Sequence, residues 1–526
     1  MSIISNMSDI NQYSKVLFGF FTQDRIKTGK QGITVNPIVS EIASWYEKIR
    51  NAMEYRQDEV LLQTTILRIL KRRILLGGGK DVAASLAREL IWARYLPDGS
   101  VTTEMLEEAQ EKIHLYIQLK KHIVDSKILK ESEASTWMFQ LMSSDLENLL
   151  NPTPEREAMG NYIFHALRPN ITIENETDEQ VNVQLFAAIH RNYTKDNIAL
   201  LRFNLFKQYF GDFNKDSYTH VSEDFKNGYI AIEKAINHPA RYKISAYAKR
   251  FIPPFLILES VLRAQKSQIY TLLENQEEFA NTIVSVCEEK YKGIVSKVRR
   301  AIVRSVAFIL LSKVFFAFAI EGTFEKYVYG NVQWLTIALN IIIPTSLMII
   351  ASFFISTPNR QNSLRILSAI KDLLYSQHPR IGYVIHFQDP TKKKASLSDI
   401  IFNFLWLTTF VLSFGGILFG LEKLHFNIAS QGIFVFFVAI VSFLSYRINQ
   451  TAHVYTLDNK QSIKTLIADF FFLPVARVGM YLTEGISQVN IILFLFDFVI
   501  ETPFKSLFGF FDQWFLYLHN KRDNLE

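Results

Sequence analysis

Four ionisable side chains interrupt strongly apolar stretches of this sequence: Lys313, Asp469, Arg477 and Asp497. A charged group in hydrocarbon is costly unless it is paired or faces water, so these residues are candidate functional positions. We interpret Asp469 and Asp497 as partners of Lys313, with Arg477 balancing the second carboxylate. Asn340 adds an amide to the middle of another apolar stretch.

Such a group of residues supports two kinds of chemistry. One is a polar pathway that carries an ion or a proton through a helix bundle. The other is a set of internal ion pairs that fix the register of the helices, with the ammonium of Lys313 reaching towards the headgroups where the geometry allows. The second interpretation is favoured, because no stretch has the regularly spaced charges or glycine-rich unwinding typical of a transport site.

The sequence lacks the motifs of the common enzyme chemistries. LLGGGKD at 75–81 resembles a phosphate loop, but Ile74 stands where the first glycine belongs and Asp81 where a hydroxyl residue would bind magnesium. This segment is therefore interpreted as the end of a helix. HExxH, GxSxG and GxGxxG are also missing. Cys287 is the only cysteine, which excludes an intramolecular disulfide and a cysteine-rich zinc cluster. We expect no catalytic residue, no metal and no cofactor.

Composition separates the chain into two parts. The 526 residues carry 57 Lys and Arg against 51 Asp and Glu, and so small an excess argues against a nucleic-acid partner. Polar and apolar residues interleave up to about residue 300, and long apolar runs follow. A helix needs about 20 apolar residues to cross a bilayer. Four runs meet this length and are predicted to span it: 301–320, 332–355, 400–421 and 428–446.

Loop charge predicts the orientation of these spans. Basic residues cluster before the first span, between the second and third, and after the fourth. The two short connections after the first and third spans carry only Lys326 and Lys423. Because basic loops stay in the cytoplasm, we expect both ends of the chain to be cytoplasmic, in a membrane of plasma or inner type. The first residues lack the basic start of a signal peptide.

The region before the spans is predicted to be an all-α cytoplasmic domain over 35–300, preceded by a segment over 1–34. Apolar residues recur three or four positions apart at 60–75, 83–95, 103–122, 178–190 and 217–237. The breaks at 150–177 could divide this domain. From 256 to 320 the chain has no proline and one glycine, Gly293, so we expect one long helix into the first span, with a break at Gly293 as the alternative.

The basic loops beneath the spans contain short β-type runs. The loop over 356–399 has a helical pattern at 361–377 followed by a strand-like run at 380–387, and the linker over 447–465 has a second run at 453–457. These two runs could pair with each other as a small sheet. A ribbon of two strands is only marginally stable, so the alternative is that neither strand forms.

The last part of the chain contains two further apolar segments and a terminal helix. The segments over 466–500 are interpreted as a membrane-embedded hairpin, either re-entrant or spanning. The segment over 501–526 is predicted to hold an amphipathic helix in the plane of the membrane. The alternative is a helix packed on protein. The candidate interface residues are Phe504, Phe508, Phe511, Trp514 and Phe515.

The sequence thus predicts a polytopic, all-α membrane protein whose partners are the lipid bilayer and other proteins. We interpret it as a scaffold or assembly protein that presents its cytoplasmic domain to protein partners. The first alternative is an ion channel or transporter, including a homo-oligomer, that uses the intramembrane charges. The second alternative is a membrane-embedded enzyme that uses the same carboxylates.

Overall fold

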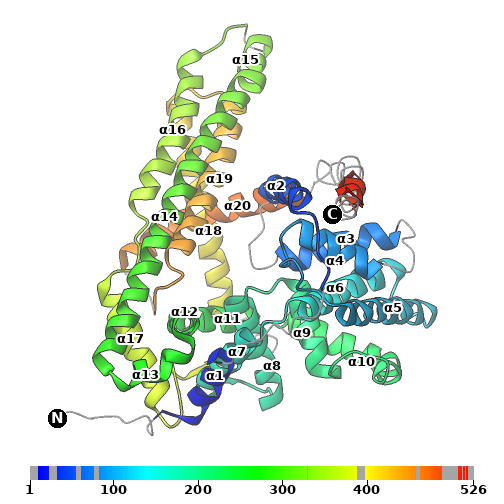
Figure 1. Cartoon of the computed structure of the whole chain (residues 1–526). Helices are drawn as coiled ribbons and strands as arrows, with labels where there is room; N and C mark the ends of the chain where they lie inside the picture. Colours follow the sequence, from blue (N-terminus) through cyan, green and yellow to red (C-terminus); the bar gives the residue numbers. More distant parts are fainter. Residues whose placement is uncertain are drawn as a thin grey trace, which may run out of the picture. The chain divides into compact units, whose positions relative to one another are not determined.

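In the computed structural model, the described residues are mostly helical (Figure 1). The two strands found among the described residues have three residues each, so the prediction of an all-α fold is confirmed. The structure describes residues 10–22, 32–54, 61–75, 82–328, 330–387, 397–457, 463–488, 507–511, 513–515 and 517–518.

The described residues form two compact units. The amino-terminal unit draws on 10–249, on 376–389 and on the described part of 491–526. The span unit draws on 250–375 and 390–490. The chain therefore leaves the amino-terminal unit near Lys249 and returns to it for 376–389 between two parts of the span unit.

Among the described residues up to Phe251, the amino-terminal unit contains eleven α-helices. They are α1 (Gln12–Thr22), α2 (Pro37–Glu54), α3 (Leu61–Leu75), α4 (Val82–Trp92), α5 (Thr103–Asp125), α6 (Glu131–Leu150), α7 (Pro154–Leu167), α8 (Asp178–Ile189), α9 (Ile198–Phe210), α10 (Tyr218–Ile236) and α11 (Arg241–Phe251). The five helices predicted from apolar spacing correspond to α3, α4, α5, α8 and α10. α3 ends at Leu75, and the glycine-rich segment that follows lies outside the described residues.

Polar side chains begin several of these helices. The Thr102 hydroxyl accepts a hydrogen bond from the backbone N–H of Met105, which satisfies a free donor in the first turn of α5. Thr177 and Gln180 form a reciprocal capping box at the start of α8. These local signals explain why helix starts in this unit are readable from sequence.

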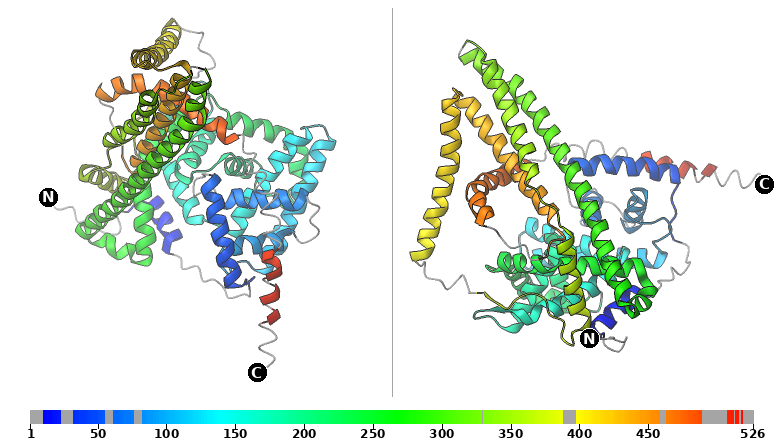
Figure 2. Two further views of the ribbon diagram at one scale, coloured as in Figure 1. Left: turned by 90° about the horizontal axis from the view of Figure 1, so that it is seen from above. Right: turned by 90° about the vertical axis from the view of Figure 1, so that its left-hand side faces the viewer.

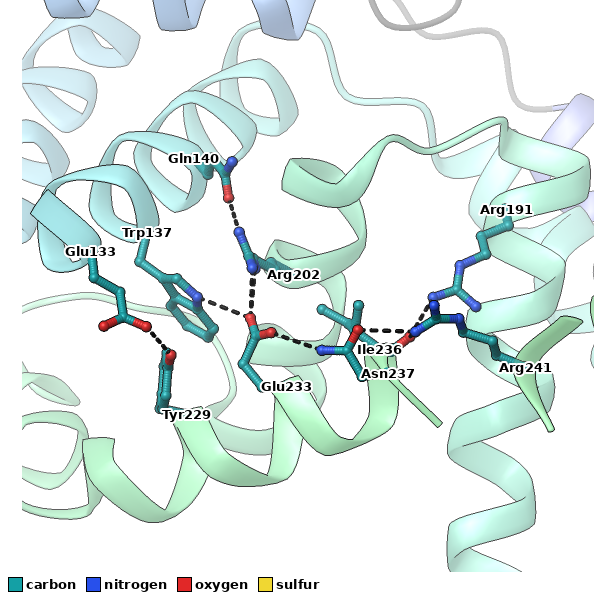
Figure 3. Close-up of polar contacts among 10 residues, drawn as sticks. All are labelled: Glu133, Trp137, Gln140, Arg191, Arg202, Tyr229, Glu233, Ile236, Asn237 and Arg241. Atoms are coloured by element: carbon teal, nitrogen blue, oxygen red, sulfur yellow. Dashed lines mark hydrogen bonds and ion pairs between the residues drawn. The ribbon is translucent and has the colours of Figure 1, made fainter. Parts of the chain in front are cut away.

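A hydrogen-bonded carboxylate joins three helices beside the core of the amino-terminal unit (Figure 3). Glu233 on α10 accepts a hydrogen bond from Arg202 Nε on α9 at 2.8 Å and from Trp137 Nε1 on α6 at 3.0 Å. Arg202 also donates to Gln140 at 2.5 Å and lies over the Trp137 ring. Every charge in this cluster has a partner, which is the condition under which buried charge is tolerated.

The two strands join distant parts of the chain. β1 (Ile171–Ile173) pairs in parallel with β2 (Ile385–Phe387), with Ile171 opposite Ile385. Asn170 Nδ2 donates to the carbonyl of Ile381 at 3.0 Å, and Tyr247 donates to the carbonyl of Tyr383 at 2.7 Å. The segment between two predicted spans is thereby attached to the amino-terminal unit.

The prediction that the strand-like run at 380–387 pairs with the run at 453–457 was wrong. The run at 453–457 forms turns, because Asn362 satisfies its backbone: the Asn362 amide donates to the carbonyl of Tyr455 at 2.7 Å and accepts from the N–H of Leu457 at 2.9 Å. The true partner, β1, lies in the 150–177 stretch, whose residue pattern indicates a break between subdomains.

The span unit consists of α12 (Pro253–Gln265), α13 (Ile269–Glu274), α14 (Gln276–Phe316), α15 (Gly322–Val328), α16 (Trp334–Phe353), α17 (Arg360–Tyr375), α18 (Leu397–Lys423), α19 (Ile428–Ala452) and α20 (Ile463–Gln488). Among the described residues, four of its helical segments are long and apolar enough to cross a membrane, and each overlaps one of the four predicted spans. They are Gln276–Val328, Trp334–Phe353, Ile400–Lys423 and Ile428–Ala452. α14, α16 and α19 pack side by side (Figures 1 and 2).

The long helix into the first span is continuous through Gly293, as predicted, but it begins later than residue 256. A backbone kink with positive φ at Lys266 ends the preceding helix, and Asn275 then caps α14 by accepting hydrogen bonds from the N–H groups of Glu277 and Glu278. Asparagine is a favoured N-cap residue, so Asn275 indicates a helix start within the predicted helix. The prediction considered only proline and glycine as helix breaks and therefore missed it.

α20 is one helix of 26 residues that contains Pro474. It packs closely on α19, because a Cβ at Gly479 would lie only 1.9 Å from the carbonyl oxygen of Ala439. This is the first arm of the predicted hairpin at 466–500. The second arm, with Asp497, lies outside the described residues.

Candidate functional site

A chain of buried polar groups joins three helices of the span unit. Lys313 Nζ on α14 donates a hydrogen bond to Oδ1 of Asn340 on α16. The Asn340 amide in turn donates to Glu321 Oε1 at 2.7 Å and to the carbonyl of Ser430 on α19 at 3.3 Å. Lys313 and Asn340 are 0% exposed and Glu321 is 1% exposed. We call these residues the Lys313 cluster.

A widened helical turn places Glu321 in this cluster. In a regular α-helix, residues eight positions apart point about 80° away from each other. Ala317–Glu321 instead forms a π-helical turn, which removes part of that rotation and turns Glu321 towards the face that carries Lys313. The π-helical turn is thus the local structure on which the Lys313–Asn340–Glu321 arrangement depends.

A second buried carboxylate lies one turn further on. Glu325 on α15 accepts a hydrogen bond from Asn427 Nδ2 at 2.7 Å and from the backbone N–H of Gln333 at 2.7 Å. Asn427 is also the N-cap of α19, where its side-chain oxygen accepts from the N–H of Ser430 at 2.8 Å. Glu325 therefore ties the start of α19 and the chain before α16 to α15.

Aromatic and aliphatic groups enclose the ammonium. Lys313 Nζ lies 4.6 Å from the centroid of the Phe437 ring, a distance suited to a cation–π interaction. Ile309, Met348 and Phe437 pack together beside it. Lys313 is therefore held inside the bundle and does not reach out to a headgroup layer, contrary to one version of the internal-pair interpretation.

Two oxygens of this region have no hydrogen-bond partner among the described residues, Glu321 Oε2 and Ser430 Oγ. Removing a cation from a buried pair leaves an uncompensated charge and costs about 3–5 kcal/mol. The geometry can accordingly fix the relative register of α14, α16 and α19. It offers no solvent-exposed acid or base, since Lys313, Glu321 and Glu325 are each at most 1% exposed.

The structure brings together two of the five predicted intramembrane residues, Lys313 and Asn340. The pairing predicted with Asp469 is not formed: Lys313 bonds to Asn340, while Asp469 lies partly buried on α20. Arg477 is exposed on α20 and lies over the rings of Trp406 and Tyr481. Asp497 is outside the described residues.

Sequence reasoning missed the two carboxylates of the site. Glu321 and Glu325 stand just after the predicted first span, in the segment predicted to be a loop. Their spacing of four places both on one helical face, which is a signal that the sequence does contain. Asn427 was also readable, because an asparagine directly before an apolar run is a typical N-cap.

The candidate interface residues of the terminal helix have different surroundings. Phe508 is buried in the core of the amino-terminal unit, and Phe515 packs against the same core. Phe511 and Trp514 are exposed, and Phe504 lies outside the described residues. Phe508 and Phe515 therefore agree with the alternative interpretation, in which the helix packs on protein. Membrane contact stays a prediction for Phe511 and Trp514.

Comparison of the chain with protein families, with curated proteins and with solved structures gives no match. Function is therefore inferred from the contacts described above.

Proposed function

We propose that this protein is a membrane-anchored scaffold or assembly protein that holds its amino-terminal unit at the cytoplasmic face of a plasma or inner-type membrane. The observation that carries the proposal is the second attachment of that unit: besides the connection at Lys249, the segment 376–389 returns to it and pairs through β2. The two units are therefore connected by the chain at more than one place, which supports a unit that stays attached to the apolar helices.

The Lys313 cluster supports the same function. Its polar groups are enclosed by packed side chains and bond to one another, as expected for residues that stabilise a helix bundle. The loop charges supply the cytoplasmic orientation in this proposal.

An exposed apolar stripe on α2 is the surface that we assign to protein partners. Ile38, Ile42 and Trp45 follow a spacing of four and three, and they are 56%, 49% and 66% exposed. The opposite face of α2 is buried through Val39, Ala43 and other residues. An apolar stripe of this spacing is the surface by which helices bind a groove in another protein.

The test is site-specific photo-crosslinking of the full-length protein in its native membrane. A photoreactive residue at position 45 is expected to give discrete protein adducts that Ile42→Ser abolishes. The matched control is position 223, where Glu223 is exposed on α10 and away from the stripe. Adducts with lipid alone, or the same pattern from both positions, would contradict the proposal.

The transport alternative keeps one supporting observation, the unpartnered Oε2 of Glu321. It is tested by ion and proton flux into liposomes that contain the purified protein. We expect no flux above protein-free liposomes. A flux that Glu321→Gln reduces, at an unchanged amount of folded protein, would favour transport over the scaffold.

A further inference from the structure

The amino-terminal unit contains a cavity of about 570 Å³ that the function proposed above does not use. Residues of α6, α7, α8 and α9 line it, together with the π-helical turn His190–Thr194. Its volume lies within the range typical of small-molecule sites. It is large enough for a ligand of several non-hydrogen atoms.

One wall of the cavity carries a carboxyl group with a free acceptor. Glu147 Oε2 on α6 is buried, and no hydrogen-bond partner reaches it from the described residues. Burial, followed by the nearby charge of Asp196, raises the pKa of Glu147 to about 8. A buried carboxyl oxygen of this kind is expensive to leave unpaired, so the position favours a ligand that supplies a donor.

A second carboxylate is fixed beside it. Asp196 Oδ2 lies 2.7 Å from His190 Nδ1 and accepts a hydrogen bond from Asn204 Nδ2 at 2.7 Å. Thr194, in the π-helical turn, donates its hydroxyl hydrogen to the carbonyl of His190 at 2.7 Å. These bonds hold the Asp196 carboxylate in place without a ligand.

Two cations, Arg156 and Lys207, line the cavity, and the charge of Arg156 acts on Glu147 and partly offsets the rise in its pKa. Arg156 donates to the carbonyl of Thr194, and Lys207 forms an ion pair with Asp212 at 3.1 Å. Glu157 adds a third carboxylate to the lining. The lining therefore holds three carboxyl groups, Glu147, Glu157 and Asp196, and two permanent cations, Arg156 and Lys207.

The rest of the lining is apolar. Phe164, Phe186 and Phe203 contribute aromatic surface, and Leu200 contributes aliphatic surface. Such a wall favours the hydrocarbon part of a ligand, and aromatic faces also attract an organic cation.

We propose that this cavity binds a small organic cation that carries a primary ammonium group on a short hydrocarbon body. The ammonium group faces Glu147 and Asp196, and the hydrocarbon lies against the aromatic wall. This inference is independent of the scaffold function, since the cavity lies wholly within the amino-terminal unit.

The test uses the full-length protein in detergent and three four-carbon probes: butylammonium, 1-butanol and butyrate. Binding is followed by saturation-transfer NMR titration at matched ionic strength, with protein-free micelles as the blank. We expect butylammonium to bind at least about tenfold more tightly than the other two probes. Equal binding of the three probes would overturn the proposal.

Two variants test the site itself. Glu147→Gln keeps the size of the side chain but removes the charge, and Gly160→Leu fills the cavity from α7, where a Cβ added to the glycine would have nothing within 4 Å. Each is expected to weaken butylammonium binding at least about tenfold. The matched control is Glu108→Gln, an exposed position on α5, which should leave binding unchanged. Thermal melting of each variant monitors folding.

The dependence on pH gives a further readout. Binding of a cation requires ionised Glu147, so affinity should rise by up to about tenfold per pH unit below pH 8 and level off above it. The other titratable groups that line the cavity are Tyr95, Arg156, Glu157, His190, Asp196 and Lys207. Glu147→Gln should flatten the rise. If that variant fails to fold, Gly160→Leu decides: unchanged butylammonium binding in Gly160→Leu overturns the assignment.

Discussion

Replacement of Lys313 by methionine tests whether Lys313 and Glu321 stabilise the bundle together through the amide of Asn340. Met fills a similar volume, but it leaves Glu321 buried without its cation and Asn340 without a donor to its Oδ1. Loss of one partner of a buried pair costs about 3–5 kcal/mol, whereas an ordinary interhelical hydrogen bond in a membrane averages about 0.6 kcal/mol. We therefore expect Lys313→Met to lower the free energy of unfolding by about 3 kcal/mol or more.

A double-mutant cycle separates this coupling from the lost packing on Phe437. Glu321→Gln keeps an acceptor for Asn340, and the double variant should lose about 2 kcal/mol less than the sum of the single variants. Unfolding is followed by denaturant titration in micelles. Arg477→Met is the control: Arg477 is exposed, so the change should cost less than about 1 kcal/mol. Additive effects of the two single changes, each below about 1 kcal/mol, would refute the coupling between Lys313 and Glu321.

Three further changes have outcomes set by the structure. Glu147→Gln should raise the melting temperature more at about pH 8.5 than at about pH 5.5. The reason is that the raised pKa of Glu147 makes the native protein lose stability, by at most about 5 kcal/mol, as the pH rises towards 8. A difference in melting temperature that is independent of pH would be evidence against this. Gly479→Leu should destabilise the protein to denaturant by at least about 1 kcal/mol, because its Cβ would meet the backbone of α19, while Gly432→Ala, with open space around it, should not. Asn170→Ala removes the donor to the 376–389 segment and should speed hydrogen exchange there, and unchanged exchange would contradict the attachment.

The features that the sequence predicted correctly are those that depend on local composition. The four long apolar helices follow from length and apolarity alone, and the helices of the amino-terminal unit follow from apolar spacing and caps such as Thr102 and Thr177. The pairing of β1 with β2 could not be read in this way, because more than 200 residues separate Ile171 from Ile385 and both strands are short. A strand signal identifies a segment but carries no information about its partner.

The Lys313 cluster was half predictable for the same reason. A lysine inside an apolar run is conspicuous, so Lys313 and the amide of Asn340 can be found from sequence. In a regular α-helix, Glu321 would lie on a different face from Lys313. The sequence therefore suggests other intramembrane carboxylates, such as Asp469, as the partner of Lys313. The π-helical turn Ala317–Glu321 brings Glu321 to the face of Lys313. A π-helical turn has no sequence signature as strong as a lysine inside an apolar run.

The Lys313 cluster and the cavity of the amino-terminal unit each contain a π-helical turn, and the cost of each turn explains its position. A π-helical turn gives up regular helical hydrogen bonds and persists where other contacts offset the loss. At Ala317–Glu321 the offsetting contact is the bond from Asn340 to Glu321. At His190–Thr194 it is the bond from the Thr194 hydroxyl to the His190 carbonyl, followed by a left-handed residue that redirects the chain to Asp196. In each case the widened turn orients a carboxylate, Glu321 or Asp196, that a regular helix would direct elsewhere. Restoration of a regular helix by deletion of one residue from either turn should therefore remove the polar arrangement while the flanking helices persist.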